Sequence, residues 1–153
     1  MIGFDHERLK VYQIAIQYIA LADNIAFSLP RGRSYLADQL GRAALSIVLN
    51  IAEGAGEFSK KGKARFYRMA LRSTTEWAAI MDVCKILGLI DEHAESQARD
   101  LLIQIVAILT TMVKNLTEEN QGEGKGKGEG LYDVISGDNS HQKVKSLMGV
   151  DRR

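Results

Sequence analysis

Apolar residues recur at steps of three and four along the first 116 positions, the spacing that places side chains on one face of an α-helix. A first helix is predicted over residues 5–29, because Pro30 closes the segment. A second is predicted over residues 34–55, ending at Gly54 and Gly56. The predicted apolar stripes are Leu9, Tyr12, Ile16, Ile19 and Ala20 in the first helix, and Leu36, Leu40, Ala43, Ile47 and Ile51 in the second.

Two further helices follow. Ser59 is the expected N-cap of a third helix that Gly88 ends, and Asp91 is the expected cap of a fourth helix that runs to Leu116. Glu92 and Glu95 lie in the first turn of the fourth helix, where the helix dipole favours negative charge. The predicted stripes are Phe66, Ala70, Ser73, Trp77, Ile80, Cys84 and Leu87 in the third helix, and Leu101, Leu102, Ile105, Ile108, Leu109, Met112, Val113 and Leu116 in the fourth.

The pattern predicts an all-α domain over residues 1–116, an antiparallel up-down four-helix bundle. A single proline and 7% aromatic residues argue against a β-sandwich or barrel, and 46% hydrophobic residues suffice for a core. Cys84 has no second cysteine to pair with, which fits a reducing compartment. With no secretory signal and nothing that approaches a membrane span, we expect a cytoplasmic protein without membrane contact.

The third and fourth helices carry more apolar surface than one core requires. The economical explanation is self-association into a homo-oligomer. Folding of the C-terminal tail over this surface, or a local rotation of the helices, is the alternative. The residues that widen the apolar faces are Leu101, Ile103, Ile105, Val106 and Ile108 in the fourth helix, with Val83 and Ile86 in the third.

The chain changes character after Leu116. Residues 117–130 are expected to form a flexible linker, since residues 122–130 alternate Gly with Glu or Lys and contain no apolar residue. The palindromic alternation fits an engineered join as well as a natural linker. Residues 131–153 hold short apolar runs too small to fold alone, and they are interpreted either as a docking peptide or as a disordered tail.

No catalytic or cofactor motif stands out. His6, His93 and His141 lack metal-ligand spacing, and neither a Gly-x-Ser-x-Gly elbow nor a phosphate-binding Walker loop occurs, so we expect no metal, no cofactor and no enzyme. A polar constellation beside the second-helix stripe is expected to form a network with the third helix. Its carboxylates could act as an acid/base pair, but counter-charges that fix the helix register are favoured. Its members are Arg42, Ser46, Asn50, Glu53, Ser73 and Glu76.

Charge is segregated along the chain, although its formal sum is only +1. Residues 57–90 contain seven Lys or Arg against three acids, and residues 91–116 contain two against four. Cations near a helix N-terminus oppose the dipole, so their placement there suggests an anionic partner such as nucleic acid. A solvated face balanced by the acidic fourth helix of a neighbour is the alternative. The six bases are Lys60, Lys61, Lys63, Arg65, Arg68 and Arg72.

The run from Arg42 to Gly54, RAALSIVLNIAEG, resembles the four-helix-bundle proteins encoded in intervening sequences of bacterial large-subunit ribosomal RNA genes. The resemblance spans residues 4–116, and its most specific part is Asn50 to Gly54. It departs from the family pattern at Arg72, where a small residue often stands, and throughout the tail after Thr117.

That family is related to the accessory variability proteins of diversity-generating retroelements, which form pentamers and bind nucleic acid and a reverse transcriptase. The resemblance therefore implies a homopentamer whose partners are RNA or DNA and a protein such as a reverse transcriptase. The competing hypothesis is an oligomeric scaffold that displays the tail in several copies and gains avidity through linked binding.

Overall fold

A computed structural model describes residues 3–121, with the side chains of residues 119–121 excepted. The expected linker beyond Gln121 and the tail at residues 131–153 lie outside the described residues. The described part is all helical, with four α-helices and two short 3₁₀ segments, which confirms the predicted fold class. The elements are η1 (Asp5–Arg8), α1 (Lys10–Ser28), η2 (Arg31–Arg33), α2 (Ser34–Gly56), α3 (Lys60–Ile86) and α4 (Glu92–Gln121).

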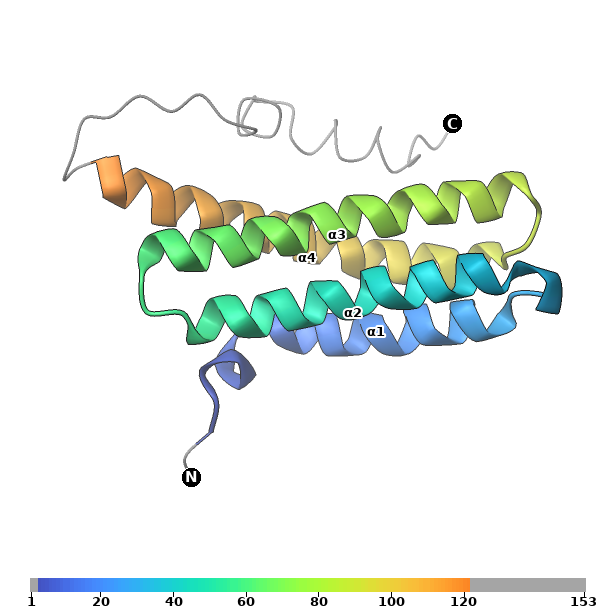
Figure 1. Ribbon diagram of the computed structural model, residues 1–153, viewed down its shortest axis with the longest axis horizontal. Coiled ribbons are helices and arrows are strands. Elements are labelled where there is room, and N and C mark those ends of the chain that lie inside the picture. The colour runs from blue at the N-terminus through green and yellow to red at the C-terminus, as the bar shows by residue number, and fades with distance from the viewer. Residues whose placement is uncertain (1–2, 122–153) are drawn as a thin grey trace.

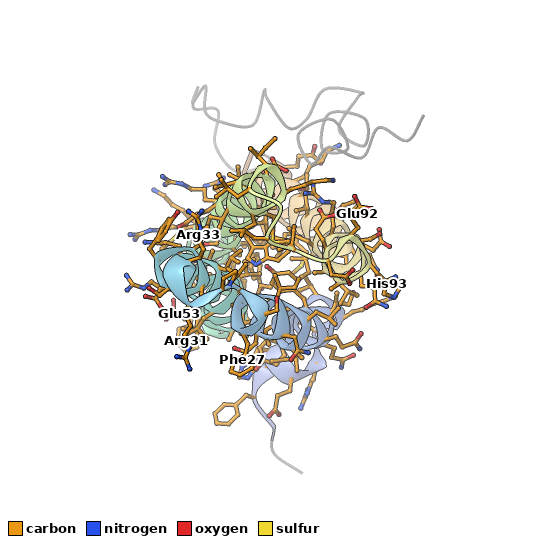
Figure 2. The ribbon with its side chains drawn as sticks, turned by 90° about the vertical axis from the view of Figure 1, so that its right-hand side faces the viewer. Phe27, Arg31, Arg33, Glu53, Glu92 and His93 are labelled. Carbon is orange, nitrogen blue, oxygen red and sulfur yellow. The ribbon has the colours of Figure 1, made fainter. Side chains whose placement is uncertain are left out.

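Successive helices run in opposite directions, and each packs against two others (Figure 1). The pairs in contact are α1 with α2, α2 with α3, α3 with α4, and α4 with α1. Viewed along the bundle, the four helices surround a core of side chains (Figure 2). The Tyr18 and Trp77 rings meet edge to face at its centre, with centroids 5.3 Å apart. The bundle thus has one core to which every helix contributes.

The helix ends follow local chemistry. The Ser59 hydroxyl accepts a hydrogen bond from the Gly62 amide at 2.9 Å, and Asp91 accepts one from the Ala94 amide at 3.1 Å. Gly88 adopts a φ of 66°, the left-handed conformation that ends a helix without the strain a side chain would add. These three predictions of helix ends are confirmed.

The predicted stripe of α2 is also confirmed, since all of its residues are buried. In α3, Ala70, Ser73, Trp77 and Cys84 are buried, whereas Phe66 and Ile80 are half-buried and Leu87 is exposed at the end of the helix. The expected fourth-helix stripe alternates buried residues with half-buried ones that pack against the core.

The stripe predicted for α1 is only partly correct, since Leu9, Tyr12 and Ile19 pack against the edge of the core. Ile16 and Ala20 are exposed, and Leu9, Tyr12 and Ile19 are only half-buried. This helix is apolar on several sides, so its spacing permits more than one stripe, and contact with α2 and α4 selects a neighbouring one. The core-facing residues are Val11, Ile14, Ala15, Tyr18, Ala22 and Ile25.

α4 departs from the sequence analysis in two ways. It continues to Gln121, past the expected boundary at Leu116, and exposed Lys114 and Glu118 form an i,i+4 pair at 3.8 Å there. Within Glu92–Glu118, a window of 18 residues reaches a mean hydropathy of 1.4, so this segment could span a membrane by length and composition alone, contrary to expectation. In the bundle this helix supplies core residues, among them Leu102, Ile105 and Leu109.

Candidate nucleic-acid interface

The connection from α2 to α3 is held by side chains that satisfy the first amides of α3. Glu57 Oε1 accepts hydrogen bonds from the Phe58 amide at 2.9 Å and from the Ser59 amide at 3.5 Å. Ser59 then caps Gly62. A Cβ at Gly62 would collide with the side chains of Glu57 and Ser59, so a glycine is required where these groups converge. The N-terminus of α3 is therefore already supplied with acceptors and one negative charge.

The six basic residues predicted as a binding surface do not share one environment. Lys60, Lys61, Arg65 and Arg72 are exposed, whereas Lys63 and Arg68 are half-buried. No acidic residue occurs between Phe58 and Thr75. The exposed cations therefore lie on a stretch of helix without an acid of its own.

Lys63 is engaged at the C-terminus of α2. Its Nζ donates to the carbonyl oxygens of Ala55 at 2.8 Å and Gly54 at 3.4 Å. The last carbonyls of a helix have no partner within the helix, and a cation there also complements the dipole. The Lys63 ammonium thus caps the C-terminus of the neighbouring helix α2.

Lys61, Arg65, Arg68 and Arg72 follow one another at spacings of four, three and four residues, which places them on one face of α3. We call these four residues the basic ridge. At 1.5 Å per residue the ridge extends for about 16 Å along the helix. Partial burial lowers the pKa of the Arg68 guanidinium from its usual value by desolvation, and an arginine still remains charged near pH 7.

Phe58 escaped the sequence analysis, although its side chain is fully exposed at 101%. It lies in the α2–α3 connection, two residues before the run of bases begins. Helical periodicity could not identify it, because the residue belongs to no helix. The available signal was an aromatic residue directly before the predicted cap Ser59 and directly beside a cationic segment.

The predicted polar network forms only in its centre, between α2 and α3. The hydroxyls of Ser46 and Ser73 lie 2.8 Å apart, and Asn50 Nδ2 donates to the Ser46 Oγ at 3.1 Å and to its carbonyl at 2.8 Å. These residues are buried or half-buried, so the cluster satisfies polar groups at the helix interface and favours one register.

The charged members of that constellation stay outside the network. Arg42, Glu53 and Glu76 are exposed, and Glu53 lies on the outer side of the bundle (Figure 2). None of them takes part in an ion pair within 4.0 Å among residues 3–118. The structure therefore brings together the small polar residues and not the predicted counter-charges.

A second charged cluster, between α3 and α4, was not foreseen. Arg99 Nε donates to Glu95 Oε1 at 2.6 Å, and Arg99 Nη2 donates to Asp82 Oδ1 at 3.3 Å. Lys85 Nζ lies 3.9 Å from Glu95 Oε2. The Glu-x-x-x-Arg spacing was the available signal, but burial of the pair depends on how the helices pack.

The histidines and the cysteine of the described chain, which could act in catalysis or bind a metal, have local contacts or are buried. The His6 ring lies 4.5 Å from the Tyr12 ring, measured between centroids, and His93 Nε2 is 3.3 Å from Gln97 Nε2. The third histidine, His141, lies outside the described residues. Cys84 is buried, as predicted for a core residue, and burial raises the pKa of its thiol. Within the described chain, no three His, Cys, Asp or Glu side chains are grouped to hold a metal ion.

Exposed apolar residues concentrate on α2 and α3. Leu45 and Leu49 are each about half exposed, and an open groove between the two helices is lined mainly by apolar surface. In contrast, most of the wide α4 face predicted for self-association is half-buried against the core of the same subunit. The exposed apolar residues of α3 are Met69, Val83 and Ile86, and Leu87 directly follows the helix. The groove is lined by Leu36, Gln39, Glu76, Ala79, Ile80 and Val83.

The chain matches a known protein family over most of the bundle. The family model described as 23S rRNA-intervening sequence protein matches residues 7–111, more than half of the 153-residue chain. The match includes all of α1, α2 and α3 and most of α4. No curated protein sequence matches the chain.

Proposed function

Because the chain belongs to the 23S rRNA-intervening sequence protein family, we propose that it is a non-enzymatic, homo-oligomeric bundle that binds nucleic acid through the basic ridge of α3. The name of this family refers to intervening sequences of 23S rRNA and states no biochemical activity. The proposed activity therefore rests on the chemistry of the surface.

The observation that carries the proposal is the exposure of Lys61, Arg65 and Arg72 along a helix face that has no acidic residue from Phe58 to Thr75. Glu57 and Glu76 flank this stretch, and the cations between them outnumber these two acids. An excess of exposed cations attracts phosphates, because binding releases condensed counterions from the nucleic acid. Lys61, Arg65 and Arg72 form no hydrogen bond or ion pair with the described residues, so their charges are available to phosphates.

Self-assembly is supported by the apolar surface of α2 and α3. Leu45, Leu49 and Met69 are between 40% and 51% exposed on adjacent helices. Covering this apolar surface by contact with a second subunit would be favourable. We propose a homopentamer on the basis of the resemblance to retroelement accessory proteins. A ring of subunits would repeat the basic ridge and strengthen its field. By the same resemblance, a reverse transcriptase or another protein is proposed as a partner.

The binding experiment compares two double variants that each remove two positive charges. Lys61→Gln with Arg65→Gln alters the ridge, and Arg31→Gln with Arg33→Gln alters the opposite end of the bundle, where α1 meets α2 (Figure 1). Fluorescence anisotropy with single-stranded RNA across a salt series should show the ridge variant losing about tenfold in affinity. Its log–log salt slope should fall by about 1.4 per subunit engaged.

The control variant should stay within about twofold of the unaltered protein, because its charges lie off the ridge. Equal effects of the two variants, or none in either, would contradict the assignment of the interface. Light scattering tests assembly independently. The unaltered protein should be a multimer, and Leu49→Glu should shift the mass in solution toward smaller species. A monomer at high concentration would refute the proposed oligomer.

A further inference from the structure

Phe58 is the most exposed large apolar side chain of the described residues, at 101%. A phenylalanine ordinarily stabilises a fold by burying its ring away from water, and the full exposure of Phe58 forgoes that contribution. It lies directly before α3, three residues from Lys61 and seven from Arg65.

The position of Phe58 does not follow from local packing. An apolar residue directly before a helix cap usually packs against an apolar residue at the fourth helical position, an arrangement called the hydrophobic staple. Here Ser59 is the cap and the fourth position is Lys63, whose ammonium turns to the carbonyls of Ala55 and Gly54. The aromatic ring therefore has no staple partner.

The backbone that carries the ring is nonetheless well fixed. The Phe58 amide donates to Glu57 Oε1 at 2.9 Å, and the next residue, Ser59, caps α3 through the Gly62 amide. Fixing the backbone on both sides lowers the entropy lost when the ring meets a ligand. An aromatic ring presented this way is preorganised for contact with a flat partner.

The surroundings of Phe58 select among flat or apolar partners. An apolar protein pocket or an uncharged lipid surface would accept the ring, but it would offer no anion to Lys61, Arg65 and Arg72. Single-stranded nucleic acid offers both complementary groups, since its bases stack on aromatic rings and its phosphates pair with cations. Bases in a duplex are already stacked and paired, so this combination favours unpaired nucleotides.

We infer that Phe58 is a stacking platform for an unpaired base of bound single-stranded nucleic acid, while Lys61 and Arg65 hold the phosphates that flank it. This inference rests on the proposed function and narrows its ligand from nucleic acid in general to unpaired segments. The strand then continues from Phe58 along the basic ridge toward Arg72. The ring contributes affinity without much sequence preference, because every base has a face that stacks.

The test compares Phe58→Ala with Phe27→Ala in the full chain. Phe27 is a matched control: it is 92% exposed, precedes Arg31 and Arg33 by a few residues, and lies at the opposite end of the bundle (Figures 1 and 2). The probes are labelled single-stranded RNA and DNA oligonucleotides and a duplex of the same sequence. F58A should weaken single-strand binding by about 5- to 150-fold and leave duplex binding and the salt slope nearly unchanged. F27A should change neither.

Two further substitutions separate stacking from simple apolar contact. F58W should retain single-strand affinity, and its fluorescence should be quenched on binding, against the constant signal of buried Trp77. F58L should lose most of the affinity that F58A loses. Equal affinity of F58A and unaltered protein for single strands overturns the inference, as does an equal loss with F27A.

The outcomes also separate this inference from the proposed function. If the Lys61 and Arg65 double variant loses binding while F58A does not, the basic ridge stands and the stacking role fails. If F58A changes the mass in solution instead of the single-strand affinity, the ring belongs to a protein interface and the inference is wrong. If the unaltered protein binds neither single strands nor duplex, both proposals fail.

Discussion

Arg99 and Glu95 form a buried ion pair one turn apart on α4, with the Arg99 Nε to Glu95 Oε1 distance 2.6 Å and both side chains only 7% exposed. Arg99 also reaches across to Asp82 on α3 at 3.3 Å. Charges withdrawn from water are tolerated where opposite charge and hydrogen bonds compensate. The Arg99–Asp82 contact therefore ties the register of α4 to that of α3.

Removing one member of this pair should be costly. Arg99→Met should lower the free energy of unfolding by about 3–5 kcal/mol, because Glu95 would stay buried without its main counter-charge. Asp82→Asn is the matched control, since Asp82 is 51% exposed and its contribution should stay below about 1 kcal/mol. Urea unfolding followed by circular dichroism measures both, and similar losses in the two variants would contradict the assignment.

Two glycines of α2 should respond in opposite directions to alanine. A Cβ at Gly54 would lie 2.5 Å from Cε1 of Tyr67 on α3, whereas a Cβ at Gly41 would meet nothing within 4 Å. Gly41→Ala should stabilise the protein by up to about 1 kcal/mol through helix propensity. Gly54→Ala should destabilise it by about 1–3 kcal/mol, because the helices must separate or Tyr67 must move. Thermal unfolding of the two variants gives the comparison, and a stabilised Gly54→Ala would contradict the close approach.

The buried hydroxyl of Tyr18 should cost stability. It has no hydrogen-bond partner among the described residues, so Tyr18→Phe should raise the free energy of unfolding at pH 7 by about 1 kcal/mol. Burial also raises the pKa of Tyr18 well above its usual value of 10.0 by desolvation. The folded state therefore holds the phenol proton more tightly than the unfolded state does. The free energy of unfolding is constant with respect to this group below about pH 10 and falls as the pH rises beyond it.

Urea unfolding at pH 7 and at about pH 10.5 tests both parts of that prediction. The unaltered protein should lose more stability between the two values than Tyr18→Phe does. A smaller dependence should remain in the variant, because burial also raises the pKa of Tyr67 and of the Cys84 thiol. Identical pH dependence of the two proteins would show that Tyr18 does not contribute.

Lys63 should affect folding more than binding. Lys63→Met removes the ammonium that donates to the carbonyls of Ala55 and Gly54, and should lower the free energy of unfolding by about 1 kcal/mol. Nucleic-acid affinity should stay within about threefold of the unaltered protein, since one engaged cation adds little to the ridge. Arg65→Met is the matched variant. It should weaken nucleic-acid binding more than Lys63→Met does and leave the free energy of unfolding nearly unchanged. A large loss of nucleic-acid affinity in Lys63→Met would show that Lys63 is part of the binding surface.

Deleting residues 122–153 should leave nucleic-acid binding and the oligomer intact, because the basic ridge and the exposed α2 and α3 residues all lie within residues 3–121. Anisotropy and light scattering on the shortened chain measure the two properties. The scaffold hypothesis makes a different prediction, in which the oligomer persists and a protein partner is lost. Loss of nucleic-acid binding on truncation would move the interface to the tail.

Local signals in the sequence were sufficient for the four helices and for the ends that a cap or a glycine marks, but not for the C-terminus of α4. Ser59, Gly88 and Asp91 act within a few residues of their own position, so their capping roles can be predicted without knowing how the helices pack. The stripe of α2 was correct because that helix carries one dominant apolar face. The cationic character of residues 60–72 is likewise a property of the chain alone.

Tertiary structure decided what depends on groups far apart in the sequence. α1 is apolar on several sides, and only contact with α2 and α4 determines that Tyr18 is buried and Ile16 exposed. Lys63 and Arg65 are both cations near the start of α3, but only the position of the α2 carbonyls separates a capping lysine from an exposed arginine. Periodicity fixes directions around one helix axis, whereas burial and hydrogen bonding depend on which neighbour lies in each direction.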